Sequence, residues 1–164
     1  MEKLKKIVYK LDDILGGVSS VFIFANMVVV TISVAMRILL HSPISGLTDI
    51  VGFLSALNAA FALGYTEKEK GFIQVDFVRE FFPRSLQRVI LSLISCISIV
   101  ALGIITVQFF RYGLSTYANS NVTWVMFLPY YPIAFGCFLG MLFYTITSLL
   151  HFVLDIHAWK EVGK

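Results

Sequence analysis

Hydrophobic and polar residues alternate along this chain in long blocks. Four runs of Leu, Ile, Val, Phe and Ala are almost free of charge, and each approaches or exceeds the roughly 20 apolar residues that a membrane-spanning helix needs. The runs extend over residues 14–40, 43–65, 89–110 and 130–154, with approximate ends. The pattern therefore predicts an all-α integral membrane protein with four transmembrane helices, arranged as a single membrane domain over residues 1–164.

Turn-forming residues mark where two of these helices begin. Ser42 can cap the second helix, and Pro43 can take its first position, where the missing N–H costs nothing. Pro129 and Pro132 mark the entry to the fourth helix. The connection between the first two helices is short, so we expect them to form an antiparallel hairpin.

A dense group of charged residues interrupts the apolar pattern between the second and third runs, within residues 64–83. Its apolar residues share one helix face: Ile73, Phe77, Val78 and Phe81. This spacing predicts a short amphipathic helix over about 72–82 that lies in the membrane interface and is ended by Pro83. A solvated loop rich in aromatic residues is the alternative.

Composition supports a membrane location. The chain of 164 residues is 58% hydrophobic and only 14% charged, whereas about a quarter of the residues of a typical soluble domain are charged. A basic segment before the first apolar run resembles a signal peptide. The run is too long for one and no cleavage site is evident, so we expect an uncleaved first span.

The placement of the basic residues predicts the orientation. Of the 13 Lys and Arg residues, only Arg37 and Arg111 lie on the side that holds the first and third connections. The others lie on the side of the two termini and the charged segment: Lys3, Lys5, Lys6, Lys10, Lys68, Lys70, Arg79, Arg84, Arg88, Lys160 and Lys164. Cytoplasmic loops are enriched in Lys and Arg, so both termini are expected in the cytoplasm.

Residues that could support catalysis are few. The sequence has no HExxH motif, no Gly-rich phosphate loop and no CxxC pair. The three histidines stand at or beyond span ends, as polar residues of the interface do. Cys96 and Cys137 lie inside apolar runs and are interpreted as small core residues. An enzyme is therefore not expected.

Two charges inside the apolar runs invite a functional hypothesis, because a charge is expensive to place in lipid. Arg37 lies near the end of the first span and Asp49 near the start of the second. They are expected to form an ion pair, to meet through water or to contact a partner, and the helix dipoles favour both positions. Alternatively, Arg37 extends to the headgroups and Asp49 points to water. Asn58 and Gln108 are polar residues within the spans. We expect them to be shielded from lipid, either by a partner protein or by other copies of this chain.

Several segments, taken in order, resemble a known family. The first span ends in "SVAMRILL", "SGLTDIVGFLSALNAAFALGYTEKEKGFIQVDFV" follows, and "TWVMFLPYYPIAFG" connects the last two spans. This order is similar to the small membrane subunit of TRAP (tripartite ATP-independent periplasmic) transporters. Arg37 stands where the family closes its first span, and Asp49 where it usually has Glu. Phe72 replaces a frequent His, so a role of that His does not transfer.

The resemblance implies a function that the pattern alone does not. Such a subunit pairs one-to-one with a large multispanning permease in a bacterial or archaeal inner membrane. The permease holds the substrate and sodium sites, and a periplasmic binding protein delivers an organic anion such as a C4-dicarboxylate or sialic acid. The small subunit is a non-catalytic scaffold, or stator, in contact with lipid; no cofactor in this chain and no nucleic acid are implied.

Six residues are the candidates for partner contact or for a structural ion pair: Arg37, Asp49, Asp76, Arg79, Arg111 and Trp124. The resemblance places the binding protein near the loop over 112–124. The alternative function is an autonomous tetraspan, either a homo-oligomeric channel or a membrane assembly factor. In that case copies of this chain would have to cover Asn58 and Gln108.

Overall fold

The computed structural model describes residues 2–39, 46–69 and 84–162, with side chains over 6–39, 46–69 and most of 90–154. Four helices make up nearly all of this: α1 (Glu2–Leu39), α2 (Leu47–Lys68), α4 (Arg84–Ala118) and α5 (Tyr131–Val162). Each is long and apolar enough to cross a membrane. In the described ranges no strand forms beyond an isolated bridge between Val122 and Pro129. The predicted all-α class with four long apolar helices is confirmed.

The helices extend beyond the apolar runs at several ends. α1 already begins at Glu2, and α5 continues to Val162. Charged residues such as Lys and Glu are good helix formers, so a polar flank changes the surroundings of a helix without ending it. The expected interfacial helix over 72–82 lies outside the described residues, and so do Asp76 and Arg79.

The start of α2 differs from the expected start at Pro43, which together with Ser42 lies outside the described residues. Gly46 precedes the helix with φ 86°, in the left-handed region that favours glycine. Its carbonyl oxygen accepts a hydrogen bond from the Asp49 N–H at 3.0 Å. The left-handed residue interrupts the helical path, and α2 therefore begins at Leu47.

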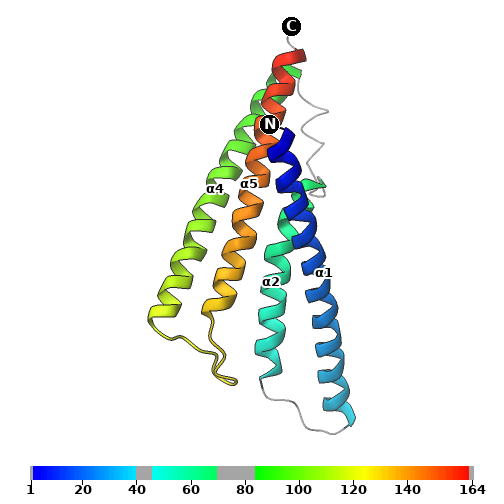
Figure 1. The fold of residues 1–164 in the computed structure, drawn as a ribbon, viewed down its shortest axis with the longest axis vertical. Coiled ribbons are helices and arrows are strands. Elements are labelled where there is room, and N and C mark those ends of the chain that lie inside the picture. Colours follow the sequence, from blue (N-terminus) through cyan, green and yellow to red (C-terminus); the bar gives the residue numbers. More distant parts are fainter. Residues whose placement is uncertain (1, 40–45, 70–83, 163–164) are drawn as a thin grey trace.

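The four helices form one layer in the spatial order α1, α2, α5, α4 (Figure 1). α1 packs on α2, α2 on α5, and α5 on α4, and α1 also touches α5. The start of α1, the end of α2, the start of α4 and the end of α5 share one end of the layer. The α4–α5 loop and the end of α1 lie at the other end.

The close approach of α2 and α5 forms the central seam of the layer. A Cβ added at Gly140 of α5 would lie 2.6 Å from the carbonyl oxygen of Ala60 on α2. Gly136 precedes it by one turn and faces Leu57. This is the small-xxx-small spacing that lets helix backbones approach in a membrane. The two hairpins, α1–α2 and α4–α5, are therefore joined along a glycine-lined contact.

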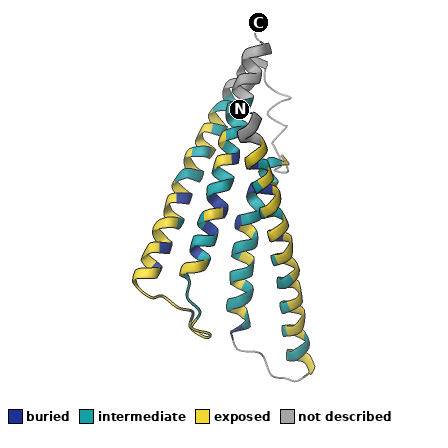
Figure 2. Ribbon diagram, viewed as in Figure 1, coloured by how far each residue is buried: buried dark blue, intermediate teal, exposed yellow. Residues whose placement is uncertain are grey.

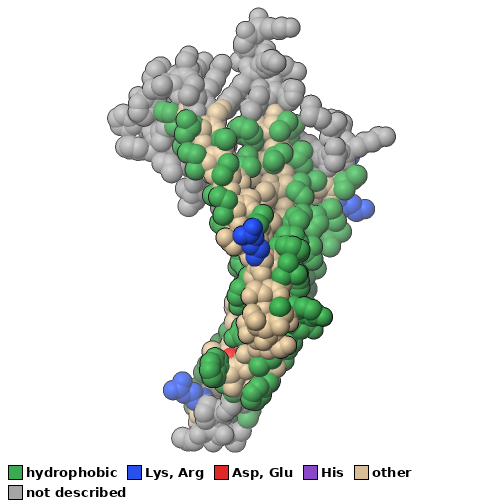
Figure 3. All heavy atoms as spheres, turned by 90° about the vertical axis from the view of Figure 1, so that its left-hand side faces the viewer, with side chains coloured by type: hydrophobic (Ala, Val, Ile, Leu, Met, Phe, Trp, Pro, Cys, Tyr) green, Lys and Arg blue, Asp and Glu red, His purple; other side chains and the backbone are tan. Residues whose placement is uncertain are grey.

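Little of the layer is interior. In the most apolar window of α5 28% of the residues are buried, compared with 6% in α1 and α4 and 11% in α2. Figure 2 shows buried positions most often on α5 and less often on the other three helices, and exposed positions along much of α1 and α4. Figure 3 views the molecule from the α4 side and shows a narrow body covered largely by hydrophobic side chains. Such a surface needs lipid or another protein against it.

Candidate functional sites at the two ends of the layer

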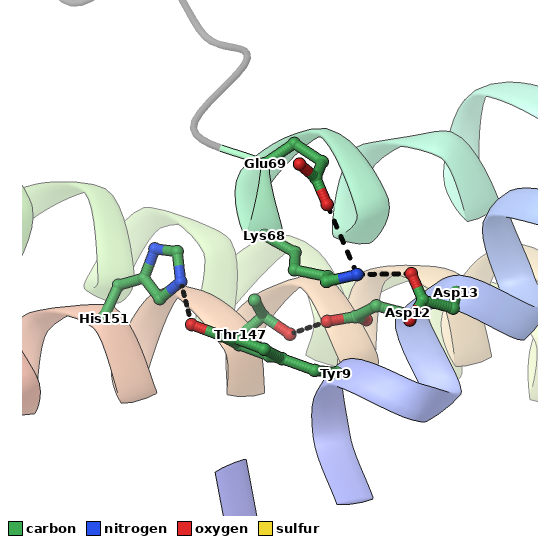
Figure 4. Close-up of polar contacts among 7 residues, drawn as sticks. All are labelled: Tyr9, Asp12, Asp13, Lys68, Glu69, Thr147 and His151. Carbon is green, nitrogen blue, oxygen red and sulfur yellow. Dashed lines mark hydrogen bonds and ion pairs between the residues drawn. The ribbon is translucent and has the colours of Figure 1, made fainter. Parts of the chain in front are cut away.

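A group of polar side chains joins three helices near the N-terminal part of α1 (Figure 4). We call it the polar junction. It comprises Tyr9, Asp12 and Asp13 of α1, Glu67, Lys68 and Glu69 at the end of α2, and Thr147 and His151 of α5. It lies at the end of the layer that is formed by the start of α1, the end of α2 and the end of α5, and these segments contain many of the basic residues of the sequence.

Asp12, like Thr147, has no exposed surface in the polar junction. Its Oδ2 atom accepts a hydrogen bond from the Thr147 hydroxyl at 2.7 Å. Its Oδ1 atom is buried and has no hydrogen-bond partner within the described residues. A Cβ at Gly64 would lie 3.0 Å from Oδ1. The missing side chain of Gly64 therefore makes room for the carboxyl group between α1, α2 and α5.

Lys68 closes the outer side of the polar junction. Its ammonium group pairs with Asp13 of α1 and lies 3.3 Å from Glu69 Oε1. It also stands over the rings of Tyr65 at 5.4 Å and Tyr9 at 5.8 Å. The cation is thus surrounded by two carboxylates and two aromatic faces, and it ties the last turn of α2 to α1.

His151 connects α5 to both helices of the first hairpin. Its Nε2 atom is 2.8 Å from the Tyr9 hydroxyl, and its ring meets that of Tyr9 edge-on at 5.9 Å. Its Nδ1 atom is 3.9 Å from Glu67 Oε1, an ion pair when the imidazole is protonated. His151 therefore links α5 to both α1 and α2, and the ion pair of Lys68 with Asp13 links α1 and α2 to each other.

Polar groups deeper in the spans are paired within the chain. The Ser19 hydroxyl donates to Asn58 Oδ1 at 2.6 Å, and Asn26 Nδ2 donates to Ser55 Oγ at 2.7 Å. Thr106 and Thr145 join α4 to α5 at 3.0 Å. Each pair joins two neighbouring helices. Gln108, in contrast, is exposed on α4.

The opposite end of the layer, which we call the open end, holds most of the predicted site residues that the structure describes. Arg37 and Arg111 are exposed, and Trp124 is 94% exposed. Asp49 is half-buried, and its Oδ2 atom is buried without a hydrogen-bond partner among the described residues. The described ion pairs do not include one between Arg37 and Asp49. The direct pair is thus absent from the single chain, and contact through water or a partner stays a prediction.

The connection between α4 and α5, residues 119–130, is an ordered loop that we call the tip loop. The Thr123 N–H donates to the Leu128 carbonyl at 2.9 Å, and the Leu128 N–H donates to the Thr123 hydroxyl at 3.1 Å. Thr123 is only 1% exposed. Phe127 has φ 54°, an uncommon conformation for a bulky residue. Two hydrogen bonds thus fix a short turn from 124 to 127.

The tip loop reaches across to the first hairpin. A Cβ at Gly46 would lie 2.2 Å from Met126 Cγ and 3.3 Å from Val125 Cγ1. The rings of Tyr130 and Phe53 meet edge-on at 5.3 Å. Figure 1 shows the loop beside the start of α2. The loop therefore packs along the first turns of α2 and connects the two hairpins at the open end.

Sequence reasoning did not find the polar junction. Asp12 lies in the polar flank before the first apolar run, and Thr147 is one of several hydroxyl residues in the fourth run. One signal was present: Val8, Asp12 and Ser19 share the buried face of α1, so a carboxyl group on that face has to meet another helix. The partner, 135 residues away, carries no such signal.

The chemistry of these sites is structural. Within the described residues, no group of three or more His, Cys, Asp or Glu side chains is arranged to hold a metal ion. Fold and sites together define a multi-pass membrane protein whose polar side chains hold its helices together.

The comparison with known families names the class of this membrane protein. A family model described as the DctQ component of the tripartite ATP-independent periplasmic transporters matches residues 26–154. The chain belongs to this family, as the sequence resemblance predicted. It is the small membrane subunit of a TRAP transporter, and the family is not an enzyme family. Membership implies a large membrane subunit and a periplasmic binding protein as partners. No curated protein matches the chain.

Proposed function

We propose that this chain is the fixed scaffold of a sodium-driven TRAP importer in a bacterial or archaeal inner membrane. It forms a single membrane domain that pairs one-to-one with the large permease. The permease binds sodium and an organic anion of the C4-dicarboxylate or sialic acid type. A periplasmic binding protein delivers that anion, and this chain contributes rigidity and contact surface.

The single-layer arrangement carries this proposal. Both faces of α1 and α4 are largely open, and apolar side chains such as Phe24 and Ile97 are 63% and 61% exposed. A bundle that conducts ions by itself needs polar groups around an enclosed path. Here several polar groups of the spans, among them Asn58 and Ser19, bond to each other between adjacent helices. The single layer that the described helices form suits a scaffold that lies against another protein.

We infer the orientation from the basic residues. The start of α1, the end of α2 and the end of α5 share one end of the layer, and the Lys and Arg residues of the sequence gather in these segments. The positive-inside tendency supports a cytoplasmic position for the polar junction and for both termini. The open end, with Arg37, Asp49 and Arg111, then faces the periplasm.

The exposed charges of the open end are the favoured contacts with the partners. Arg37 and Arg111 have no ion pair within the described part of the chain, and an unpaired charge near lipid gains most from an acidic partner group. Asp76 and Arg79 remain candidates for contact on the cytoplasmic side.

Co-purification from the native membrane in mild detergent tests the proposal. A tagged chain should recover one large multispanning protein in one-to-one ratio, identified by mass spectrometry. Recovery of this chain alone, as a defined homo-oligomer, would contradict the scaffold function and support the autonomous tetraspan.

Variants of the open end sharpen this experiment. Arg37→Ala, Asp49→Ala and the double variant should each lower recovery of the large subunit, with the double loss smaller than the sum if the two residues share one contact. Lys10→Ala, an exposed basic residue at the other end, is the matched control. Equal recovery with all four variants would remove Arg37 and Asp49 from the interface.

A further inference from the structure

We propose that the tip loop is a membrane anchor: Trp124 and Phe127 insert into the lipid interface at the open end. This assigns Trp124 to lipid, in place of the protein contact expected from the sequence. The proposal does not depend on the transport function, because it concerns the surroundings of one loop in the bilayer.

The composition of the tip loop fits a lipid interface. None of its residues, 119–130, is charged. Exposed apolar side chains gather at the turn: Val122, Trp124, Val125, Met126 and Phe127. Trp124 is 94% and Phe127 72% exposed. A loop that protruded into water would leave this apolar surface hydrated, which is unfavourable.

The backbone on both sides of the turn in the tip loop is hydrogen-bonded within the chain. Unsatisfied N–H and C=O groups are costly in lipid. Here the Thr123 and Leu128 N–H groups bond within the loop at 2.9 and 3.1 Å. The Tyr130 N–H donates to the Asn121 carbonyl, and the Asn121 N–H to the Thr116 carbonyl, each at 3.2 Å. These bonds satisfy the N–H groups on both sides of the turn within the chain, and the turn itself is left to the headgroup region, where water is still present.

The depth of the loop is given by its contacts with α2. Met126 packs at Gly46, immediately before the helix, and Tyr130 meets Phe53 about two turns further in. The candidate membrane span of α2 begins at Leu47. The turn therefore lies level with the start of a candidate membrane span, which supports a position at the boundary between headgroups and acyl chains.

Aromatic side chains also gather at the neighbouring helix ends, from which the tip loop extends (Figure 1). Tyr117 at the end of α4 and Tyr131 at the start of α5 meet edge-on at 5.6 Å, and both are exposed. Trp and Tyr are enriched at membrane interfaces because their rings are amphipathic. Trp124 continues this aromatic group, and the geometry favours lipid over a soluble protein as its neighbour.

Tryptophan fluorescence in lipid nanodiscs tests the anchor. The chain has two Trp residues, at 124 and 159, so Trp159→Phe leaves Trp124 as the sole reporter. We expect blue-shifted emission that is quenched by lipids brominated near the headgroup end of the acyl chain. Bromine near the chain terminus should quench less, and aqueous iodide should quench weakly.

The opposite pattern would overturn the proposal. Emission at the wavelength of hydrated Trp, strong iodide quenching and no effect of brominated lipid would place Trp124 in water, available to a soluble partner. Trp124→Phe, which leaves Trp159 alone, is the matched control for quenching unrelated to the loop. Because this readout needs neither the permease nor transport, failure of the anchor is distinguishable from failure of the scaffold function.

Discussion

At the polar junction, side-chain hydrogen bonds and an ion pair join α1, α2 and α5, whereas at the open end the tip loop joins the hairpins through packing against Gly46 and Phe53. The junction uses directional bonds around a carboxyl group without exposed surface. The open end keeps Arg37 and Arg111 exposed. The comparison indicates that one end fixes the helices relative to one another, and that the other end leaves its charged groups for other molecules.

Two glycines of α2 offer the largest test of this difference. Gly64→Val at the polar junction should destabilise the fold by about 1–3 kcal/mol, because its Cβ would lie 3.0 Å from Asp12 Oδ1 and 3.7 Å from the Tyr144 nitrogen. Gly52→Val, in the half of α2 nearer the open end, is the control, since a Cβ there meets nothing within 4 Å. Reversible unfolding in mixed detergent micelles measures both, and equal losses would contradict the comparison.

The hydrogen bond between Asp12 and Thr147 should have the next largest effect. Interhelical hydrogen bonds in membranes contribute about 0.6–2 kcal/mol, and we expect Asp12→Ala and Thr147→Val to be coupled by an energy in this range, since Asp12 is fully buried. A double-mutant cycle on unfolding free energies gives the coupling.

Ser20→Ala is the control for that cycle, because among the described residues the Ser20 hydroxyl bonds only to Gly16 of its own helix. Combined with Asp12→Ala it should show no coupling. A coupling near zero for Asp12 with Thr147 as well would mean that the carboxyl group does not fasten α1 to α5.

The ion pair of Lys68 should have the smallest effect. Asp13 is 53% exposed, and exposed ion pairs contribute about 0.2–1 kcal/mol. Lys68→Met keeps the apolar stem, and we expect a loss within that range that decreases at high salt. Lys10→Met, at an exposed position of α1, is the control. A loss that does not change with salt would indicate that packing against Tyr9 and Tyr65, rather than charge, holds Lys68.

The four helices could be predicted from the sequence because each is a long apolar run, a local property. Their spatial order could not. The contact between α2 and α5 depends on Gly140 meeting the backbone of Ala60, and glycine spacing within one run does not say which helix will face it. The seam is a non-local match of two surfaces.

The sites were predicted in the same uneven way. Arg37 and Asp49 stood out as charges in apolar runs, and the structure places both at the open end. The polar junction could not be predicted because the local sequence around each of its residues does not distinguish that residue from other polar residues. Lys68 belongs to a charged segment, and Thr147 resembles any hydroxyl that bonds its own helix. Only their arrangement around Asp12 gives them a common role.

The separation of Asp12 and Thr147 has a consequence for the synthesis of the chain. The two residues are 135 positions apart, and ribosomes add about 5–20 residues per second, so roughly 7–27 s pass between them. During this interval α1 and α2 enter the membrane while the Asp12 carboxyl has no α5 to receive it. We expect α1 to take its final depth only when the last helix arrives, which makes completion of the chain the step that locks the layer.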